Sequence, residues 1–224
     1  MGLAIKRRDS CDYLKDIYGE LLLVLMRNDN NVLDKIRDAI FIVQKYLHNL
    51  QEGVVLLNKL IITKALRSQY KNPDQIAHNV LANRIEKQDP GNKPKPGERM
   101  KFIHILPMSQ KDRLSKLQGT KIETISHIEK AKLKVDYVFY ITNQLMKPIQ
   151  QLLMLSWREI LVCKNVSSQK IKSIEDDIAR CPDTIRSDKY KSDIVKMYLF
   201  DSYINTINLQ NNNIRKIDHV FIRK

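Results

Sequence analysis

Two successive segments with apolar residues at helical spacing constrain how the chain begins to fold. The first apolar stripe runs from Leu14 to Leu25 and follows Asp9 and Ser10, either of which can cap a helix. The second stripe runs from Leu33 to Leu50, with charged residues on the opposite face. The residues between them, Asn28 to Asn31, are typical of a turn. The pattern predicts two antiparallel helices that bury their stripes against each other as scaffold.

The segment that follows these stripes has a different pattern. Its β-branched residues predict a strand over Lys59–Leu66. Asn72 before Pro73 predicts the start of a helix, because asparagine caps helices and proline suits the first helical position. Three prolines and two glycines between Asp89 and Gly97 predict a loop, and Met100–Leu106 is a second strand candidate.

The second half of the chain is predicted to be mostly helical. Residues 107–120 are polar and unpatterned, and we expect variable structure there. A short helix is predicted over Ile122–Lys130, and Asp136 can cap a longer one. Pro148 should interrupt that longer helix, because proline removes a backbone donor. Two further helices are predicted over Ser167–Arg180 and Asp188–Ile207.

Tyrosines recur along the helix that follows Asp136. Tyr137 and Tyr140 invite a base-stacking interpretation, but aromatic residues at helical spacing more often belong to a core. We therefore predict a mainly α fold (α+β): a helical domain with a small β element, followed by a C-terminal helical extension.

The charge of the chain is strongly positive. The 224 residues carry a net charge of +14 and give a pI near 9.6. Between Lys59 and Lys101, ten Lys/Arg against four Asp/Glu leave +6 on predicted strands and a helix rather than on a tail. A structured basic surface favours a polyanionic partner, with a solvated basic face as the alternative. Apolar runs such as Leu21–Met26 are too short to span a bilayer, and no membrane partner is expected.

The chain offers few residues for catalysis. Its five histidines lack metal-ligand spacing, and the six glycines include no phosphate-binding loop. The three cysteines show no close pairing and are interpreted as reduced thiols. Glu175, Asp176 and Asp177 are adjacent on a predicted helix, so their side chains point apart and are interpreted as a solvated face. We predict no metal site and no catalytic residue in this chain.

Several short blocks resemble a known family, in the family's order. They are Lys6-Arg7-Arg8-Asp9 with the preceding Gly2-Leu3, Ile62-Thr63-Lys64, Ala77-His78 to Arg84, Asp89 to Pro94, Gly97-Glu98-Arg99, Lys134 to Ile141, and Asn143 to Pro148. Over residues 2 to about 155 this set resembles the thumb region of family B DNA polymerases, in particular the delta-like group that includes enzymes of large DNA viruses. The family has an apolar-Pro-Tyr sequence after Arg99, where this chain has Met100-Lys101-Phe102. The second strand is therefore expected to pack differently.

The resemblance implies roles for individual residues. It places Lys6, Arg7 and Arg8 at the junction of palm and thumb, near the primer strand. It places Thr63 and Lys64 on a strand that faces product duplex. Further DNA contacts are expected from His78, Arg84, Arg99 and Lys101. Arg84 and Arg99 are also the best candidates for structural ion pairs, with carboxylates such as Asp89 or Glu98, because a guanidinium suits bidentate pairing.

The resemblance also implies a domain organisation and a function. Residues 1–10 would form the palm–thumb junction, 11–155 the thumb, and 156–224 a helical extension of unknown role. The parent protein would be a DNA-directed DNA polymerase that uses Mg²⁺, whereas this chain lacks the catalytic carboxylates and is expected to be inactive alone. Its expected partners are primer–template duplex, the palm and exonuclease parts of the polymerase, and a sliding clamp or processivity factor.

Two further expectations complete the interpretation. The setting is expected to be intracellular, in the host cytoplasm or nucleus if the protein is viral. The alternative function is a stand-alone, non-enzymatic DNA-binding or polymerase-accessory protein that shares the thumb.

Overall fold

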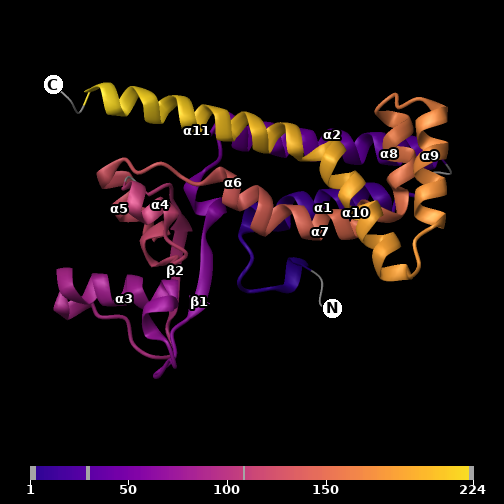
Figure 1. Ribbon diagram of the computed structural model, residues 1–224. Helices are drawn as coiled ribbons and strands as arrows, with labels where there is room; N and C mark the ends of the chain where they lie inside the picture. Colours follow the sequence, from indigo (N-terminus) through magenta and orange to yellow (C-terminus); the bar gives the residue numbers. More distant parts are fainter. Residues whose placement is uncertain (1–3, 29–30, 108, 222–224) are drawn as a thin grey trace. The chain divides into compact units, whose positions relative to one another are not determined.

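The computed structural model describes the backbone of residues 4–28, 31–107 and 109–221, and the side chains of these residues up to 212 except at positions 4 and 110. It is mainly α-helical with one small antiparallel sheet, so the predicted fold class is confirmed (Figure 1). The chain divides into two compact units. Unit 1 comprises residues 1–15 and 55–140, and unit 2 comprises residues 16–54 and 141–224. The units interleave chain segments, and the division predicted at residues 10 and 155 stays a prediction.

Unit 1 is built on a three-stranded antiparallel sheet in the order β1-β2-β3. The strands are β1 (Ile62–Ala65), β2 (Arg99–His104) and β3 (Ile122–Glu123). Because side chains alternate along a strand, Ile62 and its partner Phe102 are buried on one face, while Thr63 and its partner Lys101 lie on the other. The β1–β2 pair is therefore buried on one side at Ile62 and Phe102 and polar on the other side at Thr63 and Lys101. Despite the unusual residues after Arg99, β2 pairs regularly with β1.

Helix α3 (Ala77–Gln88) is the longest helix that lies wholly in unit 1. A helical turn starts after Asn72 as predicted, but it is a 3-10 turn over Pro73–Gln75 that Asn72 does not cap with a side-chain hydrogen bond, and the α-helix begins only at Ala77. A second 3-10 turn, Gly119–Lys121, packs against α3. Gly119 is required there, because a Cβ atom would lie 2.7 Å from the Val80 side chain.

The segment after β2 contains more structure than its sequence predicts. Residues 107–120, which we expect to be variable in structure, include a short helix, α4 (Gln110–Leu114). Residues 122–130 do not form one helix, since β3 takes the first two and α5 (Ile125–Ala131) follows. Thr124 between them caps α5 by accepting a hydrogen bond from the His127 amide.

Tyr140 is buried in the core of unit 1 and connects two segments there by hydrogen bonds. Its hydroxyl donates to the Leu60 carbonyl at 2.7 Å and accepts from the His104 amide at 3.1 Å, and its ring is fully buried. The core interpretation of this tyrosine is therefore confirmed. Asp136 caps α6 (Tyr137–Phe139) as predicted, by accepting from the Phe139 amide.

The helix that continues from α6 is interrupted before Pro148. A π-helix spans Tyr140–Leu145, and α7 (Met146–Leu153) resumes regular geometry. Pro148 has no amide hydrogen for the carbonyl four residues earlier, which favours irregular backbone in that turn. The predicted interruption is confirmed.

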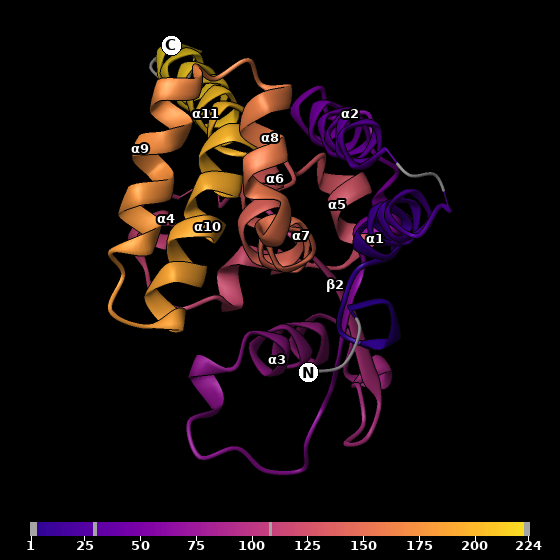
Figure 2. The same ribbon diagram turned by 90° about the vertical axis from the view of Figure 1, so that its right-hand side faces the viewer.

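Unit 2 consists of helices. Helix α1 (Asp12–Leu25) enters it from unit 1. The other helices are α2 (Val32–Gln51), α7, α8 (Trp157–Cys163), α9 (Ser168–Ala179), α10 (Thr184–Leu199) and α11 (Asp201–Phe221). Figure 2 shows α8, α9 and α10 side by side, and Leu161, Ile171 and Ile194 form a buried cluster among them.

The two predicted N-terminal helices are present, but their packing is more distributed than expected. Helix α2 packs mainly against α8, and a hydrogen bond of 2.5 Å from Tyr46 to Glu20 joins it to α1. Of the predicted turn between them, Asp29 and Asn30 lie outside the described residues, as do Gly2 and Leu3.

The helix predicted over Asp188–Ile207 is two helices. Helix α10 ends at Leu199, and Phe200, which is fully buried, separates it from α11. Helix α9 matches its predicted range closely and is capped by Ser167.

Candidate nucleic-acid interface

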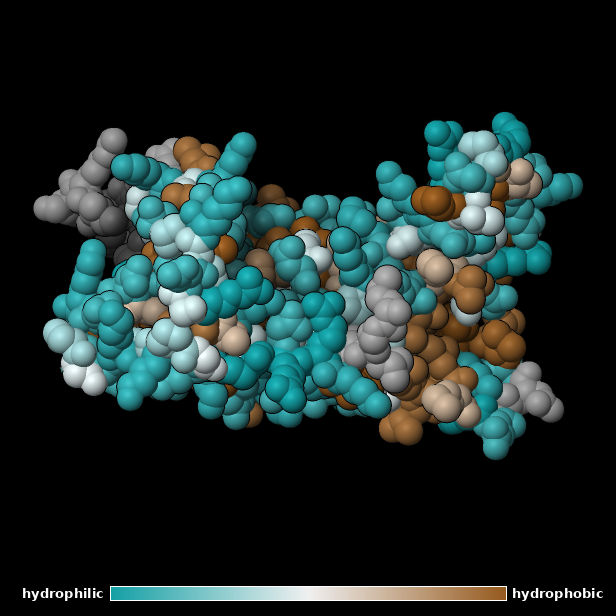
Figure 3. Space-filling model, turned by 90° about the horizontal axis from the view of Figure 1, so that it is seen from below, coloured by the Kyte–Doolittle hydropathy of each residue, from teal (hydrophilic) through white to brown (hydrophobic). Residues whose placement is uncertain are grey.

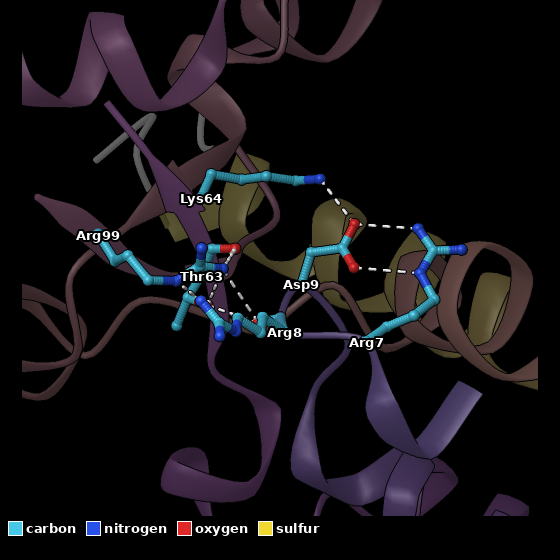
Figure 4. A network of polar contacts seen from close by, with 6 residues as sticks. All are labelled: Arg7, Arg8, Asp9, Thr63, Lys64 and Arg99. Atoms are coloured by element: carbon cyan, nitrogen blue, oxygen red, sulfur yellow. Dashed lines mark hydrogen bonds and ion pairs between the residues drawn. The ribbon is translucent and has the colours of Figure 1, made fainter. Parts of the chain in front are cut away.

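The N-terminal segment of unit 1 lies along the free edge of β1. The Thr63 hydroxyl donates to the Arg8 carbonyl at 2.6 Å, and Arg99 Nη2 donates to the same carbonyl at 3.2 Å. Strand β1 is at the edge of the sheet, and side chains of β1 and β2 hold this segment beside it. The contacts hold three of the predicted DNA-binding residues, Arg8, Thr63 and Arg99, in one place (Figure 4).

Asp9 is the centre of the polar contacts at this edge. Its carboxylate accepts two hydrogen bonds from Arg7, at 3.1 and 3.0 Å, and one from Lys64 at 2.9 Å. The hydrogen bond from Arg7, and after it that from Lys64, hold the pKa of Asp9 well below its usual range despite partial burial. Asp9 is therefore ionised throughout the neutral range. We call Arg7, Arg8, Asp9, Thr63, Lys64 and Arg99 the Asp9 network.

The two arginines expected to be structural are engaged in internal contacts, but not with the carboxylates we predicted. Arg99 donates to the Thr63 hydroxyl at 2.8 Å and to the Thr63 carbonyl at 3.0 Å. Arg84 donates to the Ile122 carbonyl at 2.7 Å and pairs with Glu123 at 3.2 Å. The prediction that Asp89 or Glu98 would be their partner is wrong. Arg99 ties the segment before α1 to the sheet, and Arg84 ties α3 to β3.

His78 lies in the first turn of α3. Its Nε2 atom lies 3.0 Å from the hydroxyl of Tyr70, which accepts a hydrogen bond from the Arg67 amide at 2.8 Å. Burial, and next the charge of Lys64, lower the pKa of His78 below its ordinary value. His78 is thus mainly neutral at pH 7 and offers a phosphate little charge.

Other basic side chains of unit 1 point to solvent. Lys6, Arg8 and Lys101 are exposed, and their side chains form no ion pair within the described part of the chain. Lys101 lies opposite Thr63, on the polar side of the β1–β2 pair. Among the predicted site residues, these three have charges that are available to a partner.

Two basic residues that we did not predict as site residues have the same properties. Arg67 and Lys71 are exposed in the loop after β1 and make no ion pair within residues 4–28, 31–107 and 109–221. The signal that could have found them is their position in the basic stretch, two and six residues after the last residue of β1. They extend the basic surface toward His78.

The positive charge of the chain is concentrated in unit 1. Unit 1 holds 21 Lys/Arg against 10 Asp/Glu and carries +11, whereas unit 2 holds 18 against 15 and carries +3. Figure 3 shows mainly hydrophilic residues over the region of α3 and the sheet. Unit 1 is thus the part of the chain suited to a polyanion.

The described residues contain neither a metal-binding cluster nor a membrane-spanning helix. Among them, no three His, Cys, Asp or Glu side chains gather closely enough to bind a metal ion. Within the same residues, no helix has the length and apolar character needed to cross a bilayer. Glu175 pairs with Arg158 at 3.0 Å and Asp177 with Arg180 at 2.9 Å, as expected of a charged surface.

Comparison with known proteins identifies the family to which this chain belongs. The model of DNA polymerase family B matches residues 1–155, more than half of the chain. This chain belongs to DNA polymerase family B. The family predicted from the ordered blocks is therefore confirmed.

Viral and cellular family B polymerases are among the relatives. The chain is 37% identical over 227 residues to a DNA polymerase of Pyramimonas orientalis virus, a match that covers 99% of this chain and 18% of that protein. It is 37% identical over 154 residues to a DNA polymerase of Acanthamoeba polyphaga mimivirus, which covers 68% of this chain and 9% of that protein. The DNA polymerase delta catalytic subunit of Candida albicans is 26% identical over 151 residues, covering 67% and 13%. The chain thus spans less than a fifth of these relatives.

A solved structure supports the fold. The family B DNA polymerase of the archaeon Pyrobaculum calidifontis superposes with a TM-score of 0.51 at 17% identity, covering 64% of this chain and 18% of that one. Residues 156–224 lie beyond the range that the family model matches. The match to the Pyramimonas orientalis virus polymerase nevertheless includes nearly all of this chain, so that relative shares sequence with the helical extension.

Proposed function

We propose that this chain is the thumb-bearing part of a DNA-directed DNA polymerase and that unit 1 holds primer–template duplex by its phosphate backbone. The observation that carries the proposal is the net charge of +11 on unit 1, together with exposed, unpaired basic side chains beside and on its sheet. A polymerase must hold whatever sequence it has just made. Lys and Arg bound to phosphates do this, because phosphate contacts fix position without reading bases.

The contacts of each basic residue support a division of roles. Lys6, Arg8 and Lys101, with Arg67 and Lys71, have exposed charges that can approach phosphates directly. Arg7 and Lys64 share Asp9 and would reach phosphate with donors that Asp9 leaves free. Thr63, Arg84 and Arg99 would act by shaping the sheet and its edge, since each donates side-chain hydrogen bonds to neighbouring segments. His78 would contribute little charge.

The whole polymerase, in this proposal, performs template-directed nucleotidyl transfer with Mg²⁺. The described residues of this chain do not provide a set of carboxylates that fits the metal, so Mg²⁺ would be held by the palm and not here. The partners would be the palm and exonuclease parts and a sliding clamp or processivity factor, at a replication site inside a cell, in the cytoplasm or nucleus of a host. Primer extension by this chain alone would contradict the assignment.

Sequence independence is the direct test of the proposed grip. Two duplexes of equal length and unrelated sequence should bind the purified chain with equal affinity, because the interface offers phosphate contacts and no base-reading element. Fluorescence anisotropy with each labelled duplex measures this. A tenfold preference for one sequence, or binding too weak to saturate at low salt, would contradict the proposal.

A further inference from the structure

Arg7 and Lys64 reach one carboxylate from two segments that are far apart in the sequence. Arg7 uses Nε and Nη2 on the two oxygens of Asp9, and Lys64 Nζ donates to the second of these oxygens. Arg7 Nη2 and Lys64 Nζ lie 3.0 and 2.9 Å from that shared oxygen, so the two nitrogens are at most the sum of these lengths apart. Figure 4 shows the two side chains meeting at Asp9 from different sides.

The carboxylate at the centre is held more firmly than the cations around it. The side chain of Asp9 is 27% exposed, against 62% for Arg7 and 45% for Lys64. The carbonyl of the preceding residue, Arg8, accepts hydrogen bonds from both Thr63 and Arg99. The backbone at Asp9 is thereby fixed to the sheet, and Asp9 acts as an anchor for the two longer side chains.

Both cations keep donors that Asp9 does not use. A guanidinium has five N–H donors, of which Arg7 commits two, and an ammonium has three, of which Lys64 commits one. The remaining donors belong to two charged groups held close together at the exposed edge of β1. One phosphate group of a DNA backbone has enough acceptor oxygens to bind both.

We propose that Asp9 is a positioning residue that holds Arg7 and Lys64 together as a two-cation clamp for a single phosphate, an inference that rests on the proposed function. Long basic side chains lose rotamer freedom when they bind, and this loss reduces affinity. Asp9 orders them before DNA arrives. The gain in DNA affinity from this ordering is larger than the loss of affinity caused by the negative charge that Asp9 brings to the surface.

This proposal and simple charge counting predict opposite results when Asp9 is neutralised. Replacing Asp9 by Asn keeps the shape of the side chain but makes the DNA-binding unit more positive by one charge. Charge alone would then tighten binding to DNA. If Asp9 positions the cations, the loss of order should instead weaken binding.

The experiment compares D9N with D74N in the full 224-residue chain. Asp74 is exposed in the same unit and makes no ion pair within the described residues, so D74N is a matched change in charge. Binding of a labelled duplex is measured by anisotropy at one low salt concentration. We expect D9N to bind roughly fivefold more weakly than the unchanged chain, and D74N to bind equally or more tightly. In the R7A/K64A background, D9N should cause no further weakening.

The controls separate this inference from the proposed function. If the unchanged chain does not bind duplex, the proposed function fails. If it binds but D9N binds equally or more tightly, only the positioning role is overturned. Melting curves of D9N and D9E identify a purely structural effect: a weakening that accompanies early unfolding in both variants would overturn the inference. Weak binding by a D9N protein that melts like the unchanged chain supports it.

Discussion

Arginine and lysine have different surroundings in unit 1. Arg84 and Arg99 direct their guanidinium groups at backbone and side-chain oxygens of neighbouring segments, and Lys6 and Lys101 extend into solvent. A guanidinium can serve several acceptors in a fixed plane, whereas an ammonium is a compact charge on a flexible stem. Arg84 and Arg99 therefore stabilise the sheet, and Lys6 and Lys101 leave their charges for a partner.

Lys64 allows a test of a single contact. Lys64→Ala should weaken duplex binding roughly fivefold, by the same factor for unrelated sequences, because it removes one phosphate contact. The melting temperature should hardly change, since an exposed ion pair contributes little to stability. K172A is the control, because Lys172 is an exposed lysine of unit 2. Equal affinities of K64A and the unchanged chain would exclude Lys64 from the interface.

The partners of single residues were the least predictable part of the site. The sequence indicates the basic stretch and predicts that Thr63 and Lys64 lie on a strand, which the range of β1 confirms. It could not find Glu123 as the partner of Arg84, or Asp9 as the partner of Lys64. These pairs are joined only by folding, since 55 positions separate Lys64 from Asp9. Local preferences contain no information about such distant contacts.

At the level of elements, periodicity predicted long helices well and short elements poorly. Helices α1, α2 and α9 and the β1–β2 pair appear where the sequence indicates them. Strand β3 was missed because it has two residues, too few for alternation to show. The break between α10 and α11 at Phe200 was missed because a buried aromatic residue fits the apolar stripe of either helix. Tertiary packing decides such cases.

The core of the sheet should make the stability of unit 1 sensitive to acid. His104 is buried, stacks on Phe139 at a centroid distance of 3.4 Å, and has its pKa lowered to about 3 by burial and by the charge of Lys121. The unfolded chain can protonate this histidine below about pH 6.5, and the folded chain cannot. Stability that is fully present above that pH is therefore lost as the pH falls toward 3.

The predicted loss can be measured by denaturation at two pH values. Between pH 7 and pH 5 the free energy of unfolding should fall by about 2 kcal/mol through His104 alone. His104→Phe removes the titrating group, so this variant should lose correspondingly less stability over the same interval. An equal loss in both proteins would show that His104 accepts a proton in the folded state.

On the scale of the whole molecule, charge is divided unequally between two units of comparable size. Unit 1 carries +11 and contains every residue of the predicted DNA contact set, and unit 2 carries +3. The family model ends at residue 155, within unit 2. Composition alone indicated a polyanionic partner, and the ordered blocks indicated the family. The sequence locates the basic stretch between Lys59 and Lys101, and the structure shows that this stretch folds into one unit with residues 1–15.

The central claim is that this chain holds duplex DNA through phosphates, and its salt dependence tests that claim most directly. A grip that neutralises about five phosphates should release their counterions and give a slope of roughly −4 to −5 for log affinity against log salt concentration. The measurement is a duplex titration of the full chain at several salt concentrations. The account predicts this steep, linear decrease. An affinity that hardly changes with salt would contradict it.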